Sequence, residues 1–458
     1  MLYLILASGF ILRLFSLKSH DFWFDEAITY HFARLPIPDL LKVVSTDNNP
    51  PLYYLLMHFV AKISTNEIFL RLPSLVASLL TIYLIYKIAN KRNRTVALFA
   101  AGLYSTSPLA VYIATEARLH SLGAFFVISL TSAYLSVIKK PKLKEISAFI
   151  AISIPALYTQ YYVALLFIPM TLILIFQKHE ITFKKWLLLA GFCFLTLAPW
   201  LIFSLRTSHN GCWCPNTLLS LPAALISPAL NGVGIVTLRS FLSLNLLIVT
   251  LFTLTALVTL VFFLKGLSSA GKVSVLYVIP LIILSILGLF FPYFSPKGFS
   301  IFSPLYFLIT AWGVSKQKNY HKYFLILMSL LAIVSTIQII NPFFHGENLK
   351  KIAMTLETDP KIPAVHTSLA TYYSLNFYNG ALQQQMLLTK NPLNFKTLEY
   401  INPKQERGDQ RLENIWFIDY PKWVDTDSYQ KGRSWILFNY KIKRSYFVDN
   451  IKFYLMEK

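Results

Sequence analysis

Two adjacent carboxylates, Asp25 and Glu26, are the residues of this sequence with the clearest capacity for chemistry. They lie in the aromatic segment FWFDEA at residues 22–27, directly after a first apolar segment. A positioned carboxylate can take the proton of an attacking hydroxyl, so the pair could serve a group-transfer reaction. A simpler interpretation is that both acids begin an interfacial helix and interact favourably with its dipole.

Few other ionisable side chains stand at the ends of apolar segments without belonging to a basic cluster. They are Arg71, Glu116, Arg118, His120 and Lys297. Carboxylates could abstract a proton, and the cations could stabilise an anion such as a phosphate. Simpler interpretations exist here too, because Arg71 and Lys297 could extend to the membrane surface and Glu116 could form a local ion pair with Arg118. Taken together, the groups suit transfer from a phosphorylated lipid.

Metal and disulfide sites are not indicated. Asp25, Glu26, Glu116 and His120 could supply metal ligands, but no close spacing between them supports a metal site, so no cofactor is expected. Three cysteines are too few for a disulfide framework. Cys193 lies in an apolar run, whereas Cys212 and Cys214 bracket Trp213 in a polar loop, where oxidation or metal binding stays open.

The composition places these residues in a polytopic membrane protein. Hydrophobic residues make up 55% of the 458 and charged residues only 14%. The net charge of +21 comes largely from short clusters of Lys and Arg between apolar runs, as the positive-inside bias predicts. We therefore expect anionic membrane lipids, and not nucleic acid, as the neighbours of this charge.

Eleven apolar segments are predicted to span the membrane as helices, which gives an all-α transmembrane fold. The apolar part of 50–62 is too short for a span and is predicted to lie at the interface. The predicted spans are 1–17, 71–89, 95–113, 119–138, the two halves of 145–177 divided near Thr159 and Gln160, 186–203, 243–264, 273–291, 300–314 and 323–340.

This arrangement puts every basic cluster on one side of the membrane and the acidic pair on the other. We therefore predict a cytoplasmic N-terminus in the cell membrane and an extracytoplasmic loop at 18–70 with interfacial helices. The transmembrane domain is predicted to cover 1–341. A small extracytoplasmic α/β domain is predicted for 342–458, with strands at 415–418, 435–438 and 446–448 and a helix at 367–377.

Several motifs resemble the membrane glycosyltransferases of the GT-C superfamily, in the branch of the protein O-mannosyltransferases and aminoarabinose transferases. The motifs are WFDEA at 23–27, DNNPPLYY at 47–54, RLPS at 71–74, Ser107-Pro108 and EARLHSL at 116–122. The resemblance covers roughly residues 1 to 135 closely and extends more loosely to 340. It implies a GT-C fold, a polyprenyl-phosphate-linked sugar as donor and an extracytoplasmic active site.

The resemblance also implies roles for individual residues. The essential aspartate of that family falls on Asp25, with the neighbouring acid on Glu26, and its arginine between helices three and four falls on Arg118. A late Arg-Tyr pair falls on Lys297 and Gly298. Lysine keeps the charge but lacks the two-pronged geometry of arginine, and the tyrosine is missing.

The predicted function is transfer of a sugar to an acceptor hydroxyl on a protein, a lipid or a surface glycan. Asp25 would be the general base, with Glu26 as its supporting neighbour in the catalytic pair. Arg118 and Lys297 would stabilise the departing lipid phosphate. A single displacement would invert the anomeric carbon. Further predicted participants are Arg71 at the phosphate and, in supporting roles, Glu116, His120 and Tyr53.

A transporter or lipid flippase is the alternative function. Such proteins tend to place ionisable residues or broken helices near the middle of the bilayer and to contain repeats. Here the predicted spans are nearly free of charge, and the sequence has no internal repeat. A shared outward site for Asp25 and Arg118 would favour the enzyme over the transporter.

Overall fold

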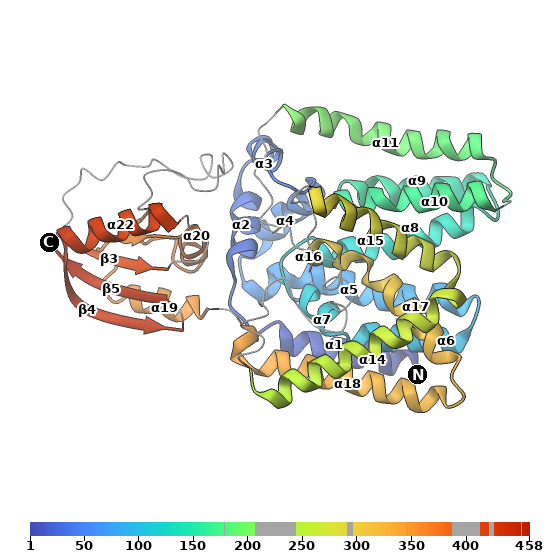
Figure 1. The fold of residues 1–458 in the computed structure, drawn as a ribbon. Coiled ribbons are helices and arrows are strands. Elements are labelled where there is room, and N and C mark those ends of the chain that lie inside the picture. The colour runs from blue at the N-terminus through green and yellow to red at the C-terminus, as the bar shows by residue number, and fades with distance from the viewer. Residues whose placement is uncertain are drawn as a thin grey trace.

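In a computed structural model, the chain forms a bundle of helices and a smaller mixed α/β part (Figure 1). The structure describes residues 1–177, 179–206, 244–290, 296–345, 347–386, 413–420, 426–449 and 451–458. Cys212 and Cys214 lie outside these ranges.

The helical bundle follows the predicted order of apolar segments. Its elements are α1 (Leu2–Ser16), α5 (Glu67–Asn90), α6 (Arg94–Thr106), α7 (Pro108–Ala114), α8 (His120–Val137), α9 (Leu143–Leu157), η1 (Tyr161–Leu166), α10 (Phe167–Phe176), α11 (Phe183–Leu205), α14 (Leu246–Ala270), α15 (Lys272–Phe290), α16 (Pro296–Phe299), η2 (Ser300–Phe302), α17 (Ser303–Ser315) and α18 (Tyr320–Ile340). Between α1 and α5 lie three short helices, α2 (Phe24–Arg34), α3 (Ile37–Val44) and α4 (Leu52–Ile63), as expected for an outer loop.

Six helices in the described part of the chain are long and apolar enough to cross a membrane, and the bent pair α6 and α7 would make a seventh. Other apolar helices, such as α1 with 15 residues, are shorter than the roughly 20 residues of a typical span. The chain is therefore a multi-pass membrane protein, whereas the count of eleven spans stays a prediction.

The predicted helix at 95–113 is broken. The chain bends by 61° between α6 and α7, where Ser107 precedes Pro108. Proline has no N–H for the helix and disfavours helical backbone in the residue before it, while the Ser107 side chain accepts from Ala110 N at 3.3 Å and starts a new helix. Arg13 of α1 donates to the Ser105 carbonyl at 2.8 Å and so satisfies an acceptor beside the break.

A five-stranded mixed sheet forms the centre of the predicted C-terminal domain. The strands are β1 (Ala364–His366), β2 (Gln384–Met386), β3 (Asn414–Asp419), β4 (Lys441–Val448) and β5 (Ile451–Glu457), in the order β2-β1-β3-β5-β4. β1 runs parallel to β2 and β3, and β5 runs antiparallel to β3 and β4. The helices of this part are α19 (Leu349–Leu356), α20 (Leu369–Tyr378) and α22 (Thr426–Asn439).

The strand predicted at 435–438 is wrong, because these residues belong to α22. β3 and β4 point the same way with β5 between them, and a connection between parallel strands needs a crossover, which α22 provides. Ile436 is buried, while Trp435 and Phe438 on either side of it are exposed. The predicted strands at 415–418 and 446–448 and the helix at 367–377 correspond to β3, β4 and α20.

The C-terminal domain lies at one end of the bundle, against α2 in the connection between α1 and α5 (Figure 1). The N-terminus and the connection between α17 and α18 lie toward the opposite end. The acidic pair therefore lies at the end of the bundle that faces the C-terminal domain.

Candidate active site

Asp25 and Glu26 occupy the first turn of α2, which Trp23 caps. The Trp23 backbone N–H points at Glu26 Oε2 across 3.5 Å, as in a capping box. The simple interpretation of the pair as helix-starting acids is thus correct about their location. Their other contacts differ and show that capping is only part of their role.

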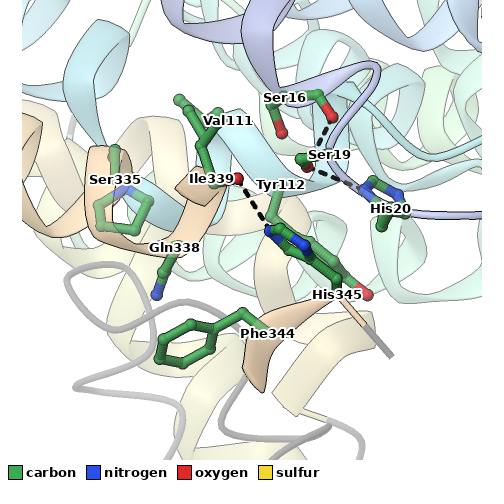
Figure 2. A pocket seen from close by; sticks show the side chains of 11 residues that line it. Ser16, Ser19, His20, Val111, Tyr112, Ser335, Gln338, Ile339, Phe344 and His345 are labelled. Carbon is green, nitrogen blue, oxygen red and sulfur yellow. Dashed lines mark hydrogen bonds between the residues drawn. The ribbon is translucent and has the colours of Figure 1, made fainter. Parts of the chain in front are cut away.

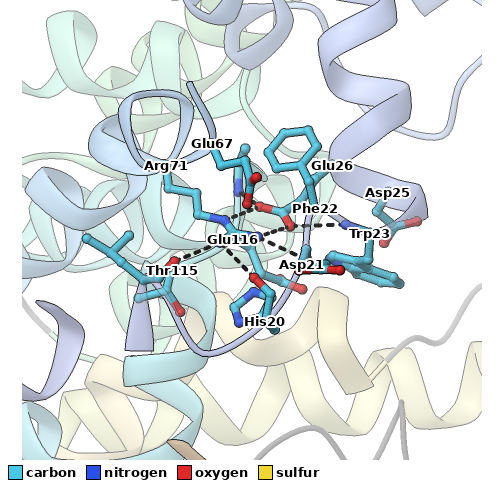
Figure 3. A network of polar contacts seen from close by, with 12 residues as sticks. His20, Asp21, Phe22, Trp23, Asp25, Glu26, Glu67, Arg71, Thr115 and Glu116 are labelled. Carbon is cyan, nitrogen blue, oxygen red and sulfur yellow. Dashed lines mark hydrogen bonds and ion pairs between the residues drawn. The ribbon is translucent and has the colours of Figure 1, made fainter. Parts of the chain in front are cut away.

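Glu26 forms a fully buried ion pair with Arg71 of α5 (Figure 3). Arg71 Nε lies 2.8 Å from Glu26 Oε1, and Arg71 Nη2 lies 2.7 Å from Oε2, so the pair has the two-pronged geometry that strengthens such contacts. Glu26 Oε1 also accepts from the backbone N–H of Ala117 at 2.7 Å. One carboxylate therefore joins the connection between α1 and α5, α5 itself and the turn that carries Glu116 and Arg118.

Arg71 uses all five of its N–H groups in this framework. Besides the two bonds to Glu26, Nη1 donates to the carbonyls of Leu17 and His20 at 2.8 and 3.2 Å, and Nη2 donates to that of Asp21 at 3.2 Å. Its side chain is 0% exposed. The geometry does not support the predicted role of Arg71 at the phosphate of the sugar donor, because no N–H group of Arg71 is left to bind that phosphate.

Asp25 faces a different partner, Lys297 of α16. Lys297 Nζ lies 3.3 Å from Asp25 Oδ2 and 3.1 Å from Glu116 Oε1, so one ammonium joins two carboxylates from distant parts of the chain. The side chains of Asp25 and Lys297 are 30% and 18% exposed, whereas Glu116 is buried. Lys297 Nζ also lies 4.2 Å from the ring centroid of Trp23, a favourable position for a cation.

The charges around Asp25 keep it ionised. Burial by itself would raise the pKa of Asp25, but Arg118 and Lys297 outweigh that effect and lower the pKa below its ordinary value. Burial raises the pKa of Glu116, and Lys297 offsets only part of this rise. Glu116 Oε2 is buried and has no hydrogen-bond partner among the described residues.

Arg118 completes this group of charges from the turn before α8. Its Nη1 donates to Thr29 Oγ1 at 3.1 Å and lies 3.4 Å from both the Asp25 carbonyl and the Tyr54 hydroxyl. Its buried Nε makes no hydrogen bond to the described part of the chain. Arg118 therefore lies beside Asp25 and keeps a donor for a ligand.

The remaining predicted participants surround this centre. The Tyr53 hydroxyl lies 3.1 Å from Ser74 Oγ, and Ser74 Oγ donates to the Arg118 carbonyl at 3.0 Å, so Tyr53 supports the Arg118 turn indirectly. His120 is the first residue of α8 and is 7% exposed. Its Nδ1 has no partner in the described ranges.

Sequence reasoning missed several residues that hold Arg118 and Lys297. Thr29 and Tyr54 contact Arg118 directly, and Tyr54 donates to Asp47 Oδ2 at 2.5 Å. Trp23 lies under Lys297. Trp23, Asp47 and Tyr54 stand inside the motifs WFDEA and DNNPPLYY, so the motifs carried the signal, but spacing alone assigned them no role.

A small polar pocket lies next to this centre, between the end of α1, α7, α18 and the segment after α18 (Figure 2). Its lining includes Ser19, His20, Tyr112, Gln338 and His345. Lys297 Nζ lies 5.7 Å from the Tyr112 ring centroid, so Tyr112 contributes both to the pocket and to the surroundings of Lys297. Among the described residues, no three His, Cys, Asp or Glu side chains are grouped so that they could hold a metal ion.

Part of the chain is similar to a known protein family. The family described as dolichyl-phosphate-mannose-protein mannosyltransferase matches residues 48–203, about a third of the chain. A comparison with curated protein sequences gives no significant match.

Solved structures share the fold over nearly the whole chain. ArnT from Cupriavidus metallidurans in the apo state superposes with a TM-score of 0.63 at 11% identity, covering 99% of this chain and 97% of ArnT. The same protein bound to undecaprenyl phosphate gives a TM-score of 0.61 at 12% identity, with the same coverage. The arabinofuranosyltransferase AftD from Mycobacteria gives a TM-score of 0.51 at 13% identity, covering 80% of this chain and 29% of AftD.

These matches confirm the predicted resemblance to GT-C glycosyltransferases. They also confirm the predicted class of enzyme, a glycosyltransferase, and the predicted helical bundle with a small C-terminal sheet.

Proposed function

We propose that this protein transfers a sugar from a polyprenyl-phosphate donor to an acceptor hydroxyl, with Asp25 as the general base. The observation that carries the proposal is the position of two cations beside Asp25. Lys297 pairs with the partly exposed carboxylate, and Arg118 lies against the backbone carbonyl of the same residue. Such an arrangement suits a reaction in which a hydroxyl loses a proton while a phosphate leaves as an anion. ArnT has the same fold and has been solved with undecaprenyl phosphate bound, which supports a lipid-phosphate donor here.

The reaction proceeds by a single displacement at the anomeric carbon. The acceptor oxygen forms a bond to this carbon while Asp25 takes the hydroxyl proton. The bond between the carbon and the phosphate oxygen breaks, and the electron pair leaves with the polyprenyl phosphate. Arg118 and Lys297 stabilise the charge that collects on this phosphate, so no protonation of the leaving group is needed. The product has the inverted configuration.

Donor binding also prepares the base. Lys297 is paired with Asp25 and Glu116 in the structure, and a phosphate that binds Lys297 neutralises part of its charge. The pKa of Asp25, which Arg118 and Lys297 hold below its ordinary value, then rises. Asp25 becomes a stronger base when the donor is in place, which couples the two halves of the reaction.

The proposed roles leave Glu26 and Arg71 as the support of the site. Both are buried, and their contacts with each other fix the start of α2 and the turn at Ala117. Glu26 therefore positions Asp25 but takes no proton. Glu116 and His120, each with an unpartnered buried atom in the described chain, stand beside the cations and are assigned to the donor head group.

The test is single-turnover sugar transfer by purified Asp25→Asn and parent protein in vesicles, with a panel of labelled polyprenyl-phosphate sugars. Asparagine keeps the shape but accepts no proton, so the rate should fall by roughly 10² to 10⁴-fold while donor binding persists. Asp39→Asn, a matched change at an exposed position of α3, should leave the rate unchanged. A rate for Asp25→Asn within a few-fold of the parent would remove Asp25 from the chemistry. Movement of donor across the bilayer without sugar transfer would favour the flippase.

The proposed orientation has the N-terminus in the cytoplasm and the site and C-terminal domain outside the cell membrane. The basic clusters between apolar helices support it. Single cysteines near positions 140 and 318 should react only with reagents that enter the cytoplasm, and one near position 30 should react from outside. External labelling at 140 would overturn this orientation.

A further inference from the structure

Helix α20 of the C-terminal domain packs directly against the segment that carries Asp25. The rings of Phe22 and Phe377 stack with their centroids 4.2 Å apart. Phe377 also meets the edge of Tyr30 at 4.9 Å. Phe22 and Phe377 are separated by more than 350 residues, so this contact forms only when both ends of the chain are in place.

Polar contacts fix the same interface. The Phe22 backbone N–H donates to the Tyr378 hydroxyl at 2.6 Å, and His31 Nε2 donates to the Tyr373 carbonyl at 3.2 Å. The Lys350 backbone N–H donates to Asp21 Oδ2 at 2.8 Å. The segment before α2 is therefore bonded to α19 and α20 through its backbone as well as its side chains.

The interface is part of a continuous buried core. Phe22 and Ala27 of the outer loop and Met57 of α4 share one apolar cluster with Leu369 and Tyr373 of α20. Each of these five residues is at most 5% exposed. The C-terminal domain thus completes the core behind the acidic pair.

Phe22 links this core to the reaction centre. Its ring lies 5.5 Å from the guanidinium carbon of Arg71, the partner of Glu26. The next residue, Trp23, caps α2 and lies under Lys297. A shift of Phe22 would therefore move the Glu26 ion pair and the start of α2, where Asp25 lies.

We propose that Phe377 and Tyr378 are positioning residues for the transfer reaction, because they hold the segment 22–26 and through it the carboxylate of Asp25. The effect on turnover rests on the proposed function, whereas the effect on the local structure does not. Cations from other elements, Arg118 and Lys297, bind the donor phosphate. Loss of the α20 contact therefore disturbs the alignment of the base more than the binding of the donor.

The experiment compares Tyr378→Phe and Phe377→Leu with the parent enzyme in full-length form. Tyr378→Phe removes the acceptor of the Phe22 N–H and keeps the aromatic ring. Because a misplacement of about 1 Å can cost roughly 10²-fold in rate, we expect kcat to fall by about 10- to 100-fold with an unchanged KM for the donor. Hydrogen exchange should speed up in the peptide 20–34 while exchange in the transmembrane helices stays the same.

Tyr429→Phe is the matched control. Its hydroxyl donates to Asp419 Oδ1 at 2.6 Å inside the C-terminal domain, away from α2. This variant should keep parental kcat and parental exchange in 20–34. Uniformly faster exchange along the whole chain in Tyr378→Phe would indicate general destabilisation and overturn the positioning role, as would parental kcat together with parental exchange in 20–34.

The two proposals fail in distinguishable ways. If no donor in the panel is turned over by the parent, the proposed function fails, and the exchange in 20–34 still reports whether α20 holds this segment. If the parent is active and Tyr378→Phe speeds exchange locally without lowering kcat, the positioning role fails alone.

Discussion

Asp25 and Glu26 are neighbours in sequence, but the surroundings of the two carboxylates differ and divide the site into two halves. Around Glu26, the side chains are 0% exposed, and every N–H of Arg71 has a partner. Around Asp25, the carboxylate is 30% exposed, its cation is shared with Glu116, and buried atoms of Glu116 and Arg118 lack partners in the described chain. We call these the closed half and the open half.

The difference separates support from chemistry. A satisfied buried ion pair gains nothing from a ligand, and breaking it leaves an uncompensated charge. Groups with partial exposure and unfilled hydrogen-bonding capacity can exchange one partner for another at small cost. The closed half therefore fixes geometry, and the open half is where a substrate can bind and react.

The largest expected effect is a loss of stability in a variant that breaks the ion pair of the closed half. Glu26→Gln should lower the free energy of unfolding by about 3–5 kcal/mol, because the buried charge of Arg71 loses its counter-ion. The measurement is denaturant or thermal unfolding in detergent. Asp25→Asn serves as the control and should change stability far less. Equal stability of the two variants would show that the halves do not differ as described.

The next effect tests the open half. Arg118→Ala should lower kcat/KM for the sugar donor by roughly 10²-fold, about 2.7 kcal/mol. Removing one hydrogen-bonding group that stabilises developing charge typically costs that much. Arg92→Ala, which removes a cation placed over Trp312 near the end of α5, is the control. Parental donor binding and turnover by Arg118→Ala would exclude the phosphate role.

A smaller effect should appear in the pH dependence. The pKa of folded Asp25 lies below its ordinary value, so its ion pairs stabilise the protein above a pH of about 3.9 and are lost as the pH falls through the folded pKa. Lys297→Met removes one of the charges that lower this pKa. The acidic limb of the kcat/KM profile should then move to higher pH. Lys297→Arg should keep the parental limb, and an unmoved limb in Lys297→Met would separate Lys297 from Asp25.

The smallest expected effect concerns Tyr54, a neighbour of Arg118 in the open half. Tyr54→Phe removes a hydroxyl that lies between Arg118 and Asp47, and it leaves both of these charged side chains in place. Both neighbours of this hydroxyl are charged, and a hydrogen bond to a charged group contributes about 1.5–3 kcal/mol. Only part of this reaches the donor through Arg118, so the KM for the donor should rise by roughly two- to tenfold. Tyr83→Phe, at an exposed position of α5, should have no effect. A loss as large as that of Arg118→Ala would place Tyr54 in the chemistry itself.

Sequence patterns were sufficient for the order of the helices because apolar length and basic clusters carry that information directly. They were insufficient where contacts between segments distant in sequence decide the local structure. The segment 435–438 has the composition of a strand, but the crossover between β3 and β4 makes it helical. Ser107-Pro108 was noted as a motif, but the apolar run around it is continuous, so a single helix was predicted there.

The site shows the same limit. Arg71 and Arg118 are both cations predicted on the same side of the membrane as the acidic pair, and nothing in their spacing separates the buried one from the available one. Only the contact between Arg71 and Glu26, 45 residues apart, distinguishes them. Lys297 lies beside Asp25, 272 residues away in sequence. Its position at the end of an apolar segment and the resemblance to a family both indicated Lys297 as a candidate, but neither predicted this ion pair.

The contact between Phe22 and Tyr378 has a consequence for the making of the protein. The two residues are 356 positions apart, and the ribosome adds roughly 5–20 residues per second, so about 20 to 70 s pass between their synthesis. During this time the loop with the acidic pair exists without the helix that covers it. On the proposed function, a nascent chain therefore carries an unfinished reaction centre until α20 has been translated, and a chain released before that point is expected to be inactive.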